Sequence, residues 1–76
     1  MHELGGEVMN DISKSALETT IEEWIVGRNA ERDREILKRR LIDGLTQEAL
    51  AEEFDMSTRQ IQRILYKEEE IIFRHI

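Results

Sequence analysis

The chain has 76 residues, with 17 acidic and 11 basic side chains, a net charge of −6, and neither cysteine nor proline. This length leaves room for one small domain with a marginally stable core, and the missing cysteines exclude a disulfide framework and thiolate metal sites. The missing prolines and few aromatic residues favour an all-α fold. No apolar run approaches the roughly 20 residues that span a bilayer, and no signal-peptide pattern opens the chain. We therefore expect a cytoplasmic protein with no membrane contact.

The N-terminal third predicts a disordered segment followed by a first helix. Residues 1–12 show no clear period, and the sequence leaves open whether Met9 is the true start. Ser15 and Glu18 form a capping box, which opens a helix to about Val26. The side chains that share its inner face are Ala16, Leu17, Thr20, Ile21, Trp24 and Ile25. This helix is expected either to cover the following elements or to build a dimer.

Two glycines mark the predicted ends of the first and second helices. Gly27 is predicted to cap the end of the first helix, and Trp24 just before it is expected in the core. Asn29 can cap a second helix over about residues 30–43, which Gly44 ends. The inner face of this second helix comprises Ala30, Ile36, Leu37, Leu41 and Ile42.

Residues 46–67 are the most informative stretch, because they predict two short helices joined by a tight turn. Thr46 is a good N-cap for the first of them. Ser57 and Gln60, three residues apart, form a capping box, so the second helix should start at Thr58. Two helices in this arrangement are typical of a helix-turn-helix.

The apolar residues of these two helices fall at one-turn spacing on their inner sides. They are Leu50, Ala51 and Phe54 on the first helix and Ile61, Ile64 and Leu65 on the second. We expect all of them except Ala51 and Leu65 to be almost fully buried. Met56 lies in the turn between the helices. Asp55 occupies the position where the turn needs positive φ, which aspartate tolerates better than most residues.

The outward side of the second helix carries Arg59, Gln62, Arg63, Tyr66 and Lys67. A helix that packs its apolar side in the core and exposes arginine and glutamine on the opposite side is suited to a DNA major groove. The three cations form a row at i, i+4 and i+8, where like charges cost a few tenths of a kcal/mol per pair. Such a row can be a solvated surface, but within a helix-turn-helix we prefer contact with phosphates and guanine edges.

The segment from Asp33 to Phe54 resembles the DNA-binding domain of bacterial sigma factors that reads the promoter's −35 element. It shares a helix, a "Gly-Leu-Thr" turn and the first helix of the motif, and the resemblance covers residues 30–67. It implies binding to double-stranded DNA, with Gln47 on the backbone and Thr58, Arg59, Gln62 and Arg63 facing the groove. The candidate DNA-binding residues are therefore Gln47, Ser57, Thr58, Arg59, Gln62, Arg63, Tyr66 and Lys67. Nothing N-terminal resembles the other sigma domains, so we expect a stand-alone small regulator.

Acidic and basic residues are concentrated in different parts of the chain, so some segments are basic although the net charge is −6. Residues 1–23 carry −5, residues 24–67 carry +1, and residues 68–76 carry −2. Within the middle block, bases dominate residues 28–40 and residues 56–67, whereas residues 43–55 hold five acids and no base. The charge close to a surface, rather than the net charge of the chain, decides whether that surface attracts phosphate, because the Debye length is about 8–10 Å. The two basic blocks are therefore expected to face DNA.

The C-terminal tail, residues 67–76, is predicted to extend the second helix of the motif. Its three glutamates are most simply a solvated face, with repulsion from DNA as the alternative. The apolar residues of the tail are too many for a free end, so they either pack back on the first helix, which we favour, or pair with a second chain. They are Ile71, Ile72, Phe73 and Ile76.

No constellation of residues predicts catalysis, a metal or a cofactor. His2 and His75 lie near opposite ends without ligand spacing, and no Ser/His/acid set or phosphate loop is present. We expect one all-α domain over residues 13–76, a compact bundle of about four helices with a helix-turn-helix at 46–67. The predicted function is a bacterial transcription regulator that binds double-stranded DNA as a homodimer. The alternative is a protein-interaction module, either an RNA polymerase-binding sigma mimic or an antitoxin-like partner.

Overall fold

Four helices make up the described part of the chain, residues 13–76 of the computed structural model. They are α2 (Lys14–Trp24), α3 (Ala30–Leu41), α4 (Gln47–Glu53) and α5 (Thr58–Arg74). These residues contain no strand, so the predicted all-α bundle is confirmed. The predicted disordered segment, residues 1–12, lies outside the described part. Across residues 13–76, none of the helices has both the length and the apolar character that crossing a membrane requires.

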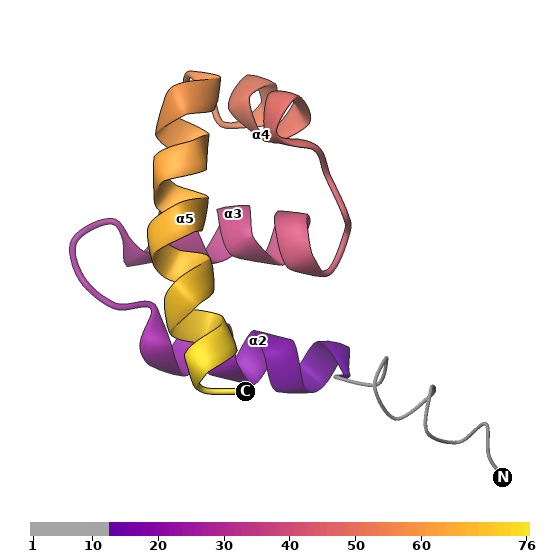
Figure 1. The fold of residues 1–76 in the computed structure, drawn as a ribbon, viewed down its shortest axis with the longest axis vertical. Helices are drawn as coiled ribbons and strands as arrows, with labels where there is room; N and C mark the ends of the chain where they lie inside the picture. Colours follow the sequence, from indigo (N-terminus) through magenta and orange to yellow (C-terminus); the bar gives the residue numbers. More distant parts are fainter. Residues whose placement is uncertain (1–12) are drawn as a thin grey trace, which may run out of the picture.

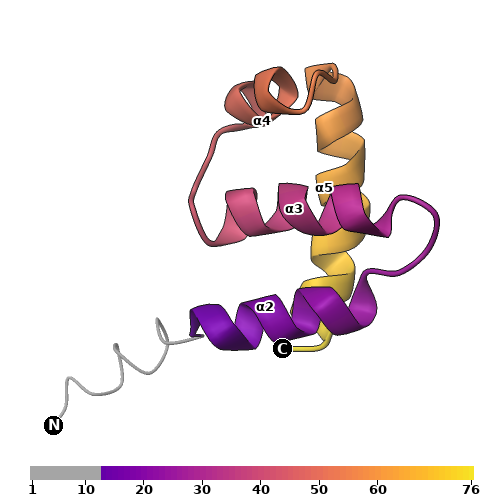
Figure 2. The same cartoon turned by 180° about the vertical axis from the view of Figure 1, so that it is seen from behind.

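The longest helix, α5, organises the bundle because it contacts each of the other three helices. It runs along the long axis of the molecule, with α4 beside its first turns, α2 beside its last turns and α3 crossing between them (Figure 1). The view from behind shows α2 and α3 lying side by side on the same side of α5 (Figure 2). The first half of α5 therefore projects together with α4 at one end of the bundle.

The start of α2 differs from the sequence prediction. Its N-cap is Ser13, whose hydroxyl accepts a hydrogen bond from the backbone N–H of Ala16 at 3.1 Å, and the helix begins at Lys14. The predicted capping box of Ser15 and Glu18 is therefore wrong. Ser13 offers the same capping chemistry two residues earlier, in the extended backbone conformation that an N-cap needs.

The loops around α3 follow the predicted residues, with shifted boundaries. Asn29 is the N-cap, although its side chain makes no capping hydrogen bond, and α3 ends at Leu41, two residues earlier than predicted. Gly44 has φ +77° and Gly27 has φ +115°, conformations that residues with a Cβ rarely adopt. Gly27 lies beyond the C-cap of α2, which is Ile25, rather than forming that cap itself.

The core lies where the four helices meet. Of the seventeen side chains predicted on the inner faces of the helices, seven are buried in the core and five more pack against it, whereas Ala16 and Trp24 are exposed. Eight apolar side chains are buried: Ile21, Ile25, Ile36, Leu37, Leu50, Ile61, Leu65 and Ile72. Phe54 and Ile64 pack against this cluster but are only partly buried, so their predicted full burial is wrong. Phe54 is the C-cap of α4 and Ile64 belongs to the first half of α5, the elements that extend past α3 (Figure 1).

Trp24 is not a core residue, which contradicts the prediction. Its side chain is 45% exposed and its ring stacks on His75, with ring centroids 3.7 Å apart and planes inclined by 13°. Trp24 is the last residue of α2 and His75 is the C-cap of α5, so the stack joins the ends of the two helices. Ile21 and Ile25 fill the buried interface instead.

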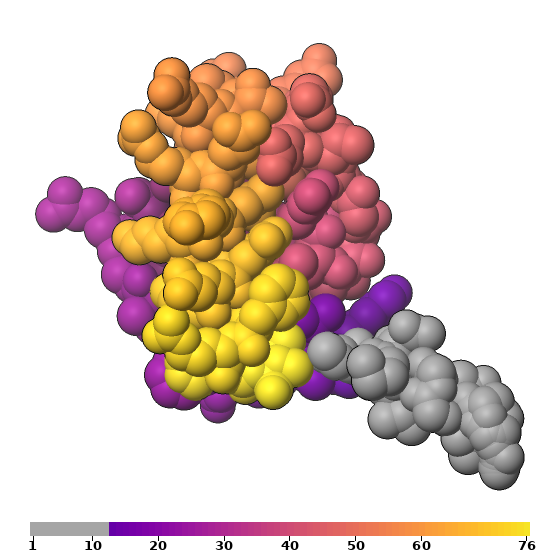
Figure 3. All heavy atoms as spheres, viewed as in Figure 1, coloured from indigo at the N-terminus to yellow at the C-terminus, as the bar shows by residue number. Residues whose placement is uncertain are grey.

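The tail continues α5 to Arg74, and part of it packs back on the bundle as predicted. Ile72 is fully buried and Ile71 packs against the core. The C-terminal end of α5 lies over α2 in the space-filling view (Figure 3). Phe73 and Ile76 remain exposed.

Candidate nucleic-acid interface

Backbone hydrogen bonds fix the turn between α4 and α5. The N–H of Phe54 donates to the carbonyl oxygen of Leu50 at 2.9 Å, and the N–H of Met56 donates to that of Ala51 at 2.9 Å. Asp55 between them has φ +55°, as the sequence predicts. This single left-handed residue lets the chain leave α4 and start α5 within four residues.

The predicted capping box starts α5 and sets the direction in which its side chains project. The hydroxyl of Ser57 accepts from the backbone N–H of Gln60 at 3.1 Å, and the side-chain oxygen of Gln60 accepts from the N–H of Ser57 at 2.9 Å. The Ser57 side chain is thus committed to the cap rather than free for a ligand. Thr58 follows as the first helical residue and is half-buried.

A side-chain bridge couples α4 to α5. Gln62 Nε2 donates to Gln47 Oε1 at 3.0 Å, which joins the first residue of α4 to the outward side of α5. Thr46 holds that end of α4, because its hydroxyl accepts from the N–H of Ala49 at 3.1 Å. The two amides that the sequence predicts as DNA contacts are therefore adjacent in space and hold each other in place.

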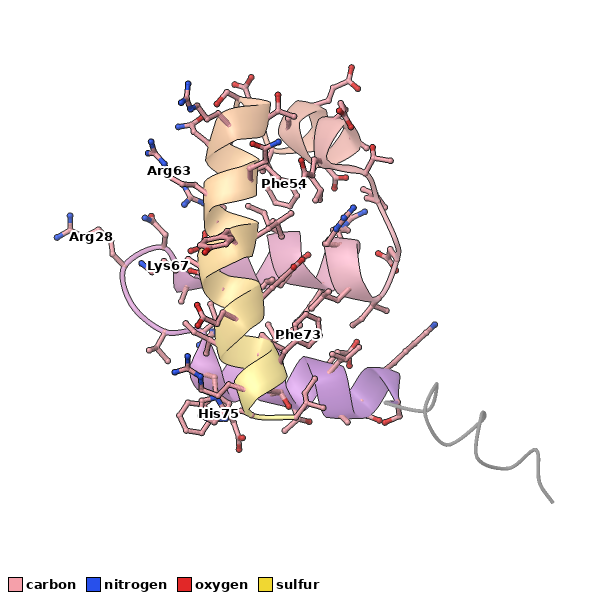
Figure 4. All side chains as sticks on the ribbon, viewed as in Figure 1. Arg28, Phe54, Arg63, Lys67, Phe73 and His75 are labelled. Carbon is pink, nitrogen blue, oxygen red and sulfur yellow. The ribbon has the colours of Figure 1, made fainter. Side chains whose placement is uncertain are left out.

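The outward residues of α5 form one exposed ridge, which we call the α5 face. It consists of Arg59, Gln62, Arg63, Tyr66 and Lys67, all exposed. Tyr66 is 84% exposed. Arg63 and Lys67 project to the same side of α5, and Arg28 in the loop before α3 extends farther out on that side (Figure 4). Arg28 therefore adds a cation that the predicted site did not include.

Two surface hollows flank this ridge. The larger one, of about 580 Å³, lies toward α4 and is lined by Arg40, Gln47, Arg59, Gln62, Arg63, Leu65, Tyr66 and Glu69. The smaller one, of about 370 Å³, lies toward the start of α3 and is lined by Asn29, Arg32, Asp33, Arg63, Ile64, Tyr66, Lys67 and Glu68. Arg63 and Tyr66 line both hollows, so they stand on the crest between them.

Ion pairing separates the basic residues of the described chain into two groups. Five of the six bases in residues 28–40 have an acidic partner, and Lys38 with Glu22 is the closest of these pairs, at 2.7 Å. That contact lowers the pKa of Glu22 and raises the pKa of Lys38. Within residues 13–76, no acid lies within ion-pair distance of Arg59, Arg63 or Lys67. The α5 face therefore keeps its positive charge available.

The glutamates after Lys67 are not the uniform solvated face that the sequence predicts. Glu68 is buried, whereas Glu69 lies 4.0 Å from Arg40 and Glu70 pairs with Arg74 at 2.9 Å. Glu68 follows Leu65 by three residues and precedes Ile72 by four, which is the spacing of the buried stripe of α5. This spacing was the available signal for its burial.

A second acid, Asp33 on α3, meets Glu68 at the crossing of α3 and α5. Asp33 Oδ1 accepts a hydrogen bond from Arg32 Nε at 3.1 Å and lies 3.0 Å from Arg32 Nη2. By contrast, Glu68 Oε1 is buried without a hydrogen-bond partner. Burial and the neighbouring Asp33 carboxyl, which could accept the hydrogen of a protonated Glu68 and whose charge repels the ionised form, raise the pKa of Glu68 to about 7. We call these two residues the acidic pair.

The structure gathers all eight predicted DNA-binding residues at α4, the turn and the first half of α5. Five of them form the α5 face, Gln47 touches that face, and Ser57 and Thr58 begin the helix. Arg28 and Arg40 belong to the basic block expected to face DNA but are not among the eight predicted residues, and neither Glu69 nor the acidic pair was predicted to take part. No protein-family model matches the chain, and neither the curated proteins nor the solved structures give a significant match.

Proposed function

We propose that this protein is a transcription regulator that binds double-stranded DNA in a sequence-specific manner. In this proposal α4, the turn and α5 act as a helix-turn-helix, and α5 is the recognition helix. The observation that carries it is the α5 face: three cations without acidic partners among residues 13–76, interleaved with an amide and a tyrosine on one exposed ridge.

The chemistry of the face matches what a major groove offers. Arginine can donate two hydrogen bonds to a guanine edge, glutamine can pair with adenine, and any of the cations can bind phosphate. Residues 58–67 span about 15 Å at 1.5 Å per residue, which is comparable to the roughly 12 Å width of the major groove. Gln47, held beside Gln62, is placed for the backbone at the edge of the groove.

The acidic remainder of the chain supports specificity within this proposal. Beyond Lys67 the outward side of α5 turns acidic, because Glu70 is exposed and Glu69 is partly so. Repulsion from phosphate would then limit the length of α5 that enters the groove. The net charge of −6 would weaken contacts with random duplex, so affinity would depend on base contacts by the α5 face.

We also propose that two chains bind together. Two apolar side chains are left exposed near the C-terminal end of α5, Phe73 at 56% and Ile76 at 47%. Gln62 lies about 20 Å along α5 from that end. Two inclined copies meeting there would set their recognition helices on the order of 34 Å apart, the spacing of successive major grooves. Sedimentation equilibrium with and without duplex tests this, and a monomer in both conditions would contradict it.

A second candidate function is a protein-interaction module, such as an RNA polymerase-binding regulator. The observation that favours it is the acidic outer side of α4, where Glu48 and Glu52 are exposed close to Asp55 in the turn. This side would repel phosphate but would suit a basic protein surface. The α5 face does not share this character, so DNA binding is the function that the described surface supports best.

Selection from a genome-fragment library with purified protein, at 50 and 150 mM salt, tests the proposed function. We expect enrichment of duplexes that share one short site, and loss of that enrichment in an Arg59→Ala/Arg63→Ala double variant. The matched control is Arg39→Ala, because Arg39 is paired with Glu53 at 2.9 Å and lines neither hollow beside the α5 face. Failure to enrich any duplex at either salt would overturn DNA binding in favour of the interaction module.

A further inference from the structure

The acidic pair lies directly beneath the proposed DNA-binding surface. Asp33 is 8% exposed and Glu68 is 9% exposed, so both residues are largely covered at the crossing of α3 and α5. Asp33 has a cationic partner in Arg32, but Glu68 has none at comparable range. Two neighbouring carboxylates at such a position repel each other, so they share a proton more readily than they both ionise.

The pair and the DNA-binding cations share one hollow. Its lining includes Asp33 and Glu68 together with Arg63 and Lys67 of the α5 face. The charged groups around Glu68 are Asp33 and Arg32 from α3 and Lys67 and Arg63 from α5; within residues 13–76, neither α2 nor α4 contributes a residue to the hollow. The state of this one carboxyl therefore sets the charge next to two of the three cations.

We propose that the acidic pair is a proton-operated control of DNA binding: the face binds duplex while the pair holds a proton, and loss of that proton weakens binding. This inference rests on the proposed function of the α5 face. The ionised Glu68 carboxylate would attract Lys67 and Arg63 into the hollow and offset their charge. The protonated carboxyl would donate its hydrogen to Asp33 and leave both cations free for phosphate.

The direction in which pH changes DNA affinity follows from the linkage between proton binding and DNA binding. Duplex phosphates brought near Glu68 disfavour its charged form, so DNA binding takes up a proton and affinity falls as pH rises through about 7, the pKa of Glu68 in the free protein. If binding raises that pKa by one unit, affinity falls about fivefold from pH 6 to pH 8 and approaches a tenfold loss at higher pH. No change is expected below pH 5, where the pair holds its proton in both states.

The test is fluorescence anisotropy with the selected duplex at pH 6, 7 and 8 and constant ionic strength. We expect about a fivefold loss of affinity for the natural chain from pH 6 to pH 8, the change that a one-unit pKa shift produces over this range. Glu68→Gln, which mimics the protonated carboxyl, should bind at all three pH values as the natural chain does at pH 6. Asp33→Asn should move the loss of affinity to lower pH, because Glu68 then has no acidic neighbour.

Histidines titrate in the same range, so the comparison is repeated in a His2→Gln/His75→Gln background, where the pH dependence should persist. Circular dichroism shows whether each variant is folded, and a 13C NMR titration of the Glu68 carboxyl reports its protonation without DNA. Equal affinity of the natural chain at all three pH values, or an unchanged pH dependence in Glu68→Gln, would overturn the inference and leave DNA binding intact. Absence of binding at every pH would overturn the proposed function as well.

Discussion

Helix α3 and the first half of α5 are both rich in basic residues, but they use them differently. Four of the five bases of α3 pair with acids on other helices, such as Glu22 on α2 and Glu53 on α4, and Arg32 pairs with Asp33 beside it. The bases of the α5 face find no acid among residues 13–76. Basic residues along a sequence therefore do not by themselves mark a nucleic-acid surface, because the packing of other helices decides which charges stay available.

The same contrast appears within α5 itself. Its inner side places Ile61, Leu65 and Ile72 in the core, whereas its outer side carries the α5 face. The helix is thus both the centre of the bundle and its most exposed basic element. Substitutions on the two sides should separate stability from binding, and substitutions on α3 and α5 should separate paired from unpaired cations.

The largest effect is expected for Ile61→Ala, on the inner side of α5. Ile61 is fully buried, so its truncation should lower the free energy of unfolding by about 2–5 kcal/mol. This is a large part of the stability of so small a domain. Ile76→Ala is the matched control, because Ile76 is 47% exposed and its truncation should change stability by less than about 1 kcal/mol. Equal losses in urea denaturation would show that the inner side has been assigned wrongly.

The next effect separates α5 from α3. Arg59→Ala and Arg63→Ala should each lower the affinity for the selected duplex by about 1–3 kcal/mol, because each removes a base or phosphate contact. Arg39→Ala removes a cation that already pairs with Glu53, so its affinity should be close to that of the natural chain. Anisotropy titrations provide the comparison. Losses of similar size in all three variants would mean that net charge, rather than the α5 face, governs binding.

A smaller effect concerns stability and pH. The pKa of Glu68 is raised to about 7 in the folded chain, so the stability it contributes is full below about pH 4.5 and is lost as pH rises through 7. At 1.36 kcal/mol per pKa unit, and with allowance for solvent screening, the loss is on the order of 1–2 kcal/mol. Glu68→Gln should remove this loss in denaturation curves at pH 5 and pH 8. A Glu68→Gln chain as pH-sensitive as the natural one would contradict the assignment.

The smallest effect is expected at the end of the face. Lys67→Ala should weaken binding to specific and random duplex alike and reduce the slope of log affinity against log salt by about 1, since one phosphate contact is lost. A change in site preference without a change in slope would instead place Lys67 on a base edge.

Local rules predicted much of this fold because the interactions that begin and end its helices join residues only three or four positions apart. Thr46, Ser57 and Asp55 act within three or four residues of themselves, and each takes the predicted role. The outward position of the α5 face likewise follows from helical period alone. The capping rule misplaced the start of α2, because Ser13 and Ser15 both carry a hydroxyl that can accept a hydrogen bond from the first turn of a helix.

The remaining features depend on contacts between distant residues. The stack of Trp24 on His75, the bridge of Gln47 to Gln62 and the pairing of α3 with its neighbours each join separate helices. Helical period could have placed Asp33 and Glu68 on inner faces, but only the crossing of α3 and α5 brings them together. The expectation that Glu68 is a solvated acid was therefore wrong, although its spacing on the buried stripe of α5 could have shown it.

The most direct test of the central claim is a titration of 15N-labelled protein with the selected duplex, followed by two-dimensional NMR. If the α5 face binds DNA, the largest chemical-shift changes should occur at residues 58–67 and at Gln47, with Arg28 also affected, and α2 should be almost unchanged. Changes centred on α2 and the C-terminal end of α5, or none at a duplex concentration well above the measured dissociation constant, would contradict this account.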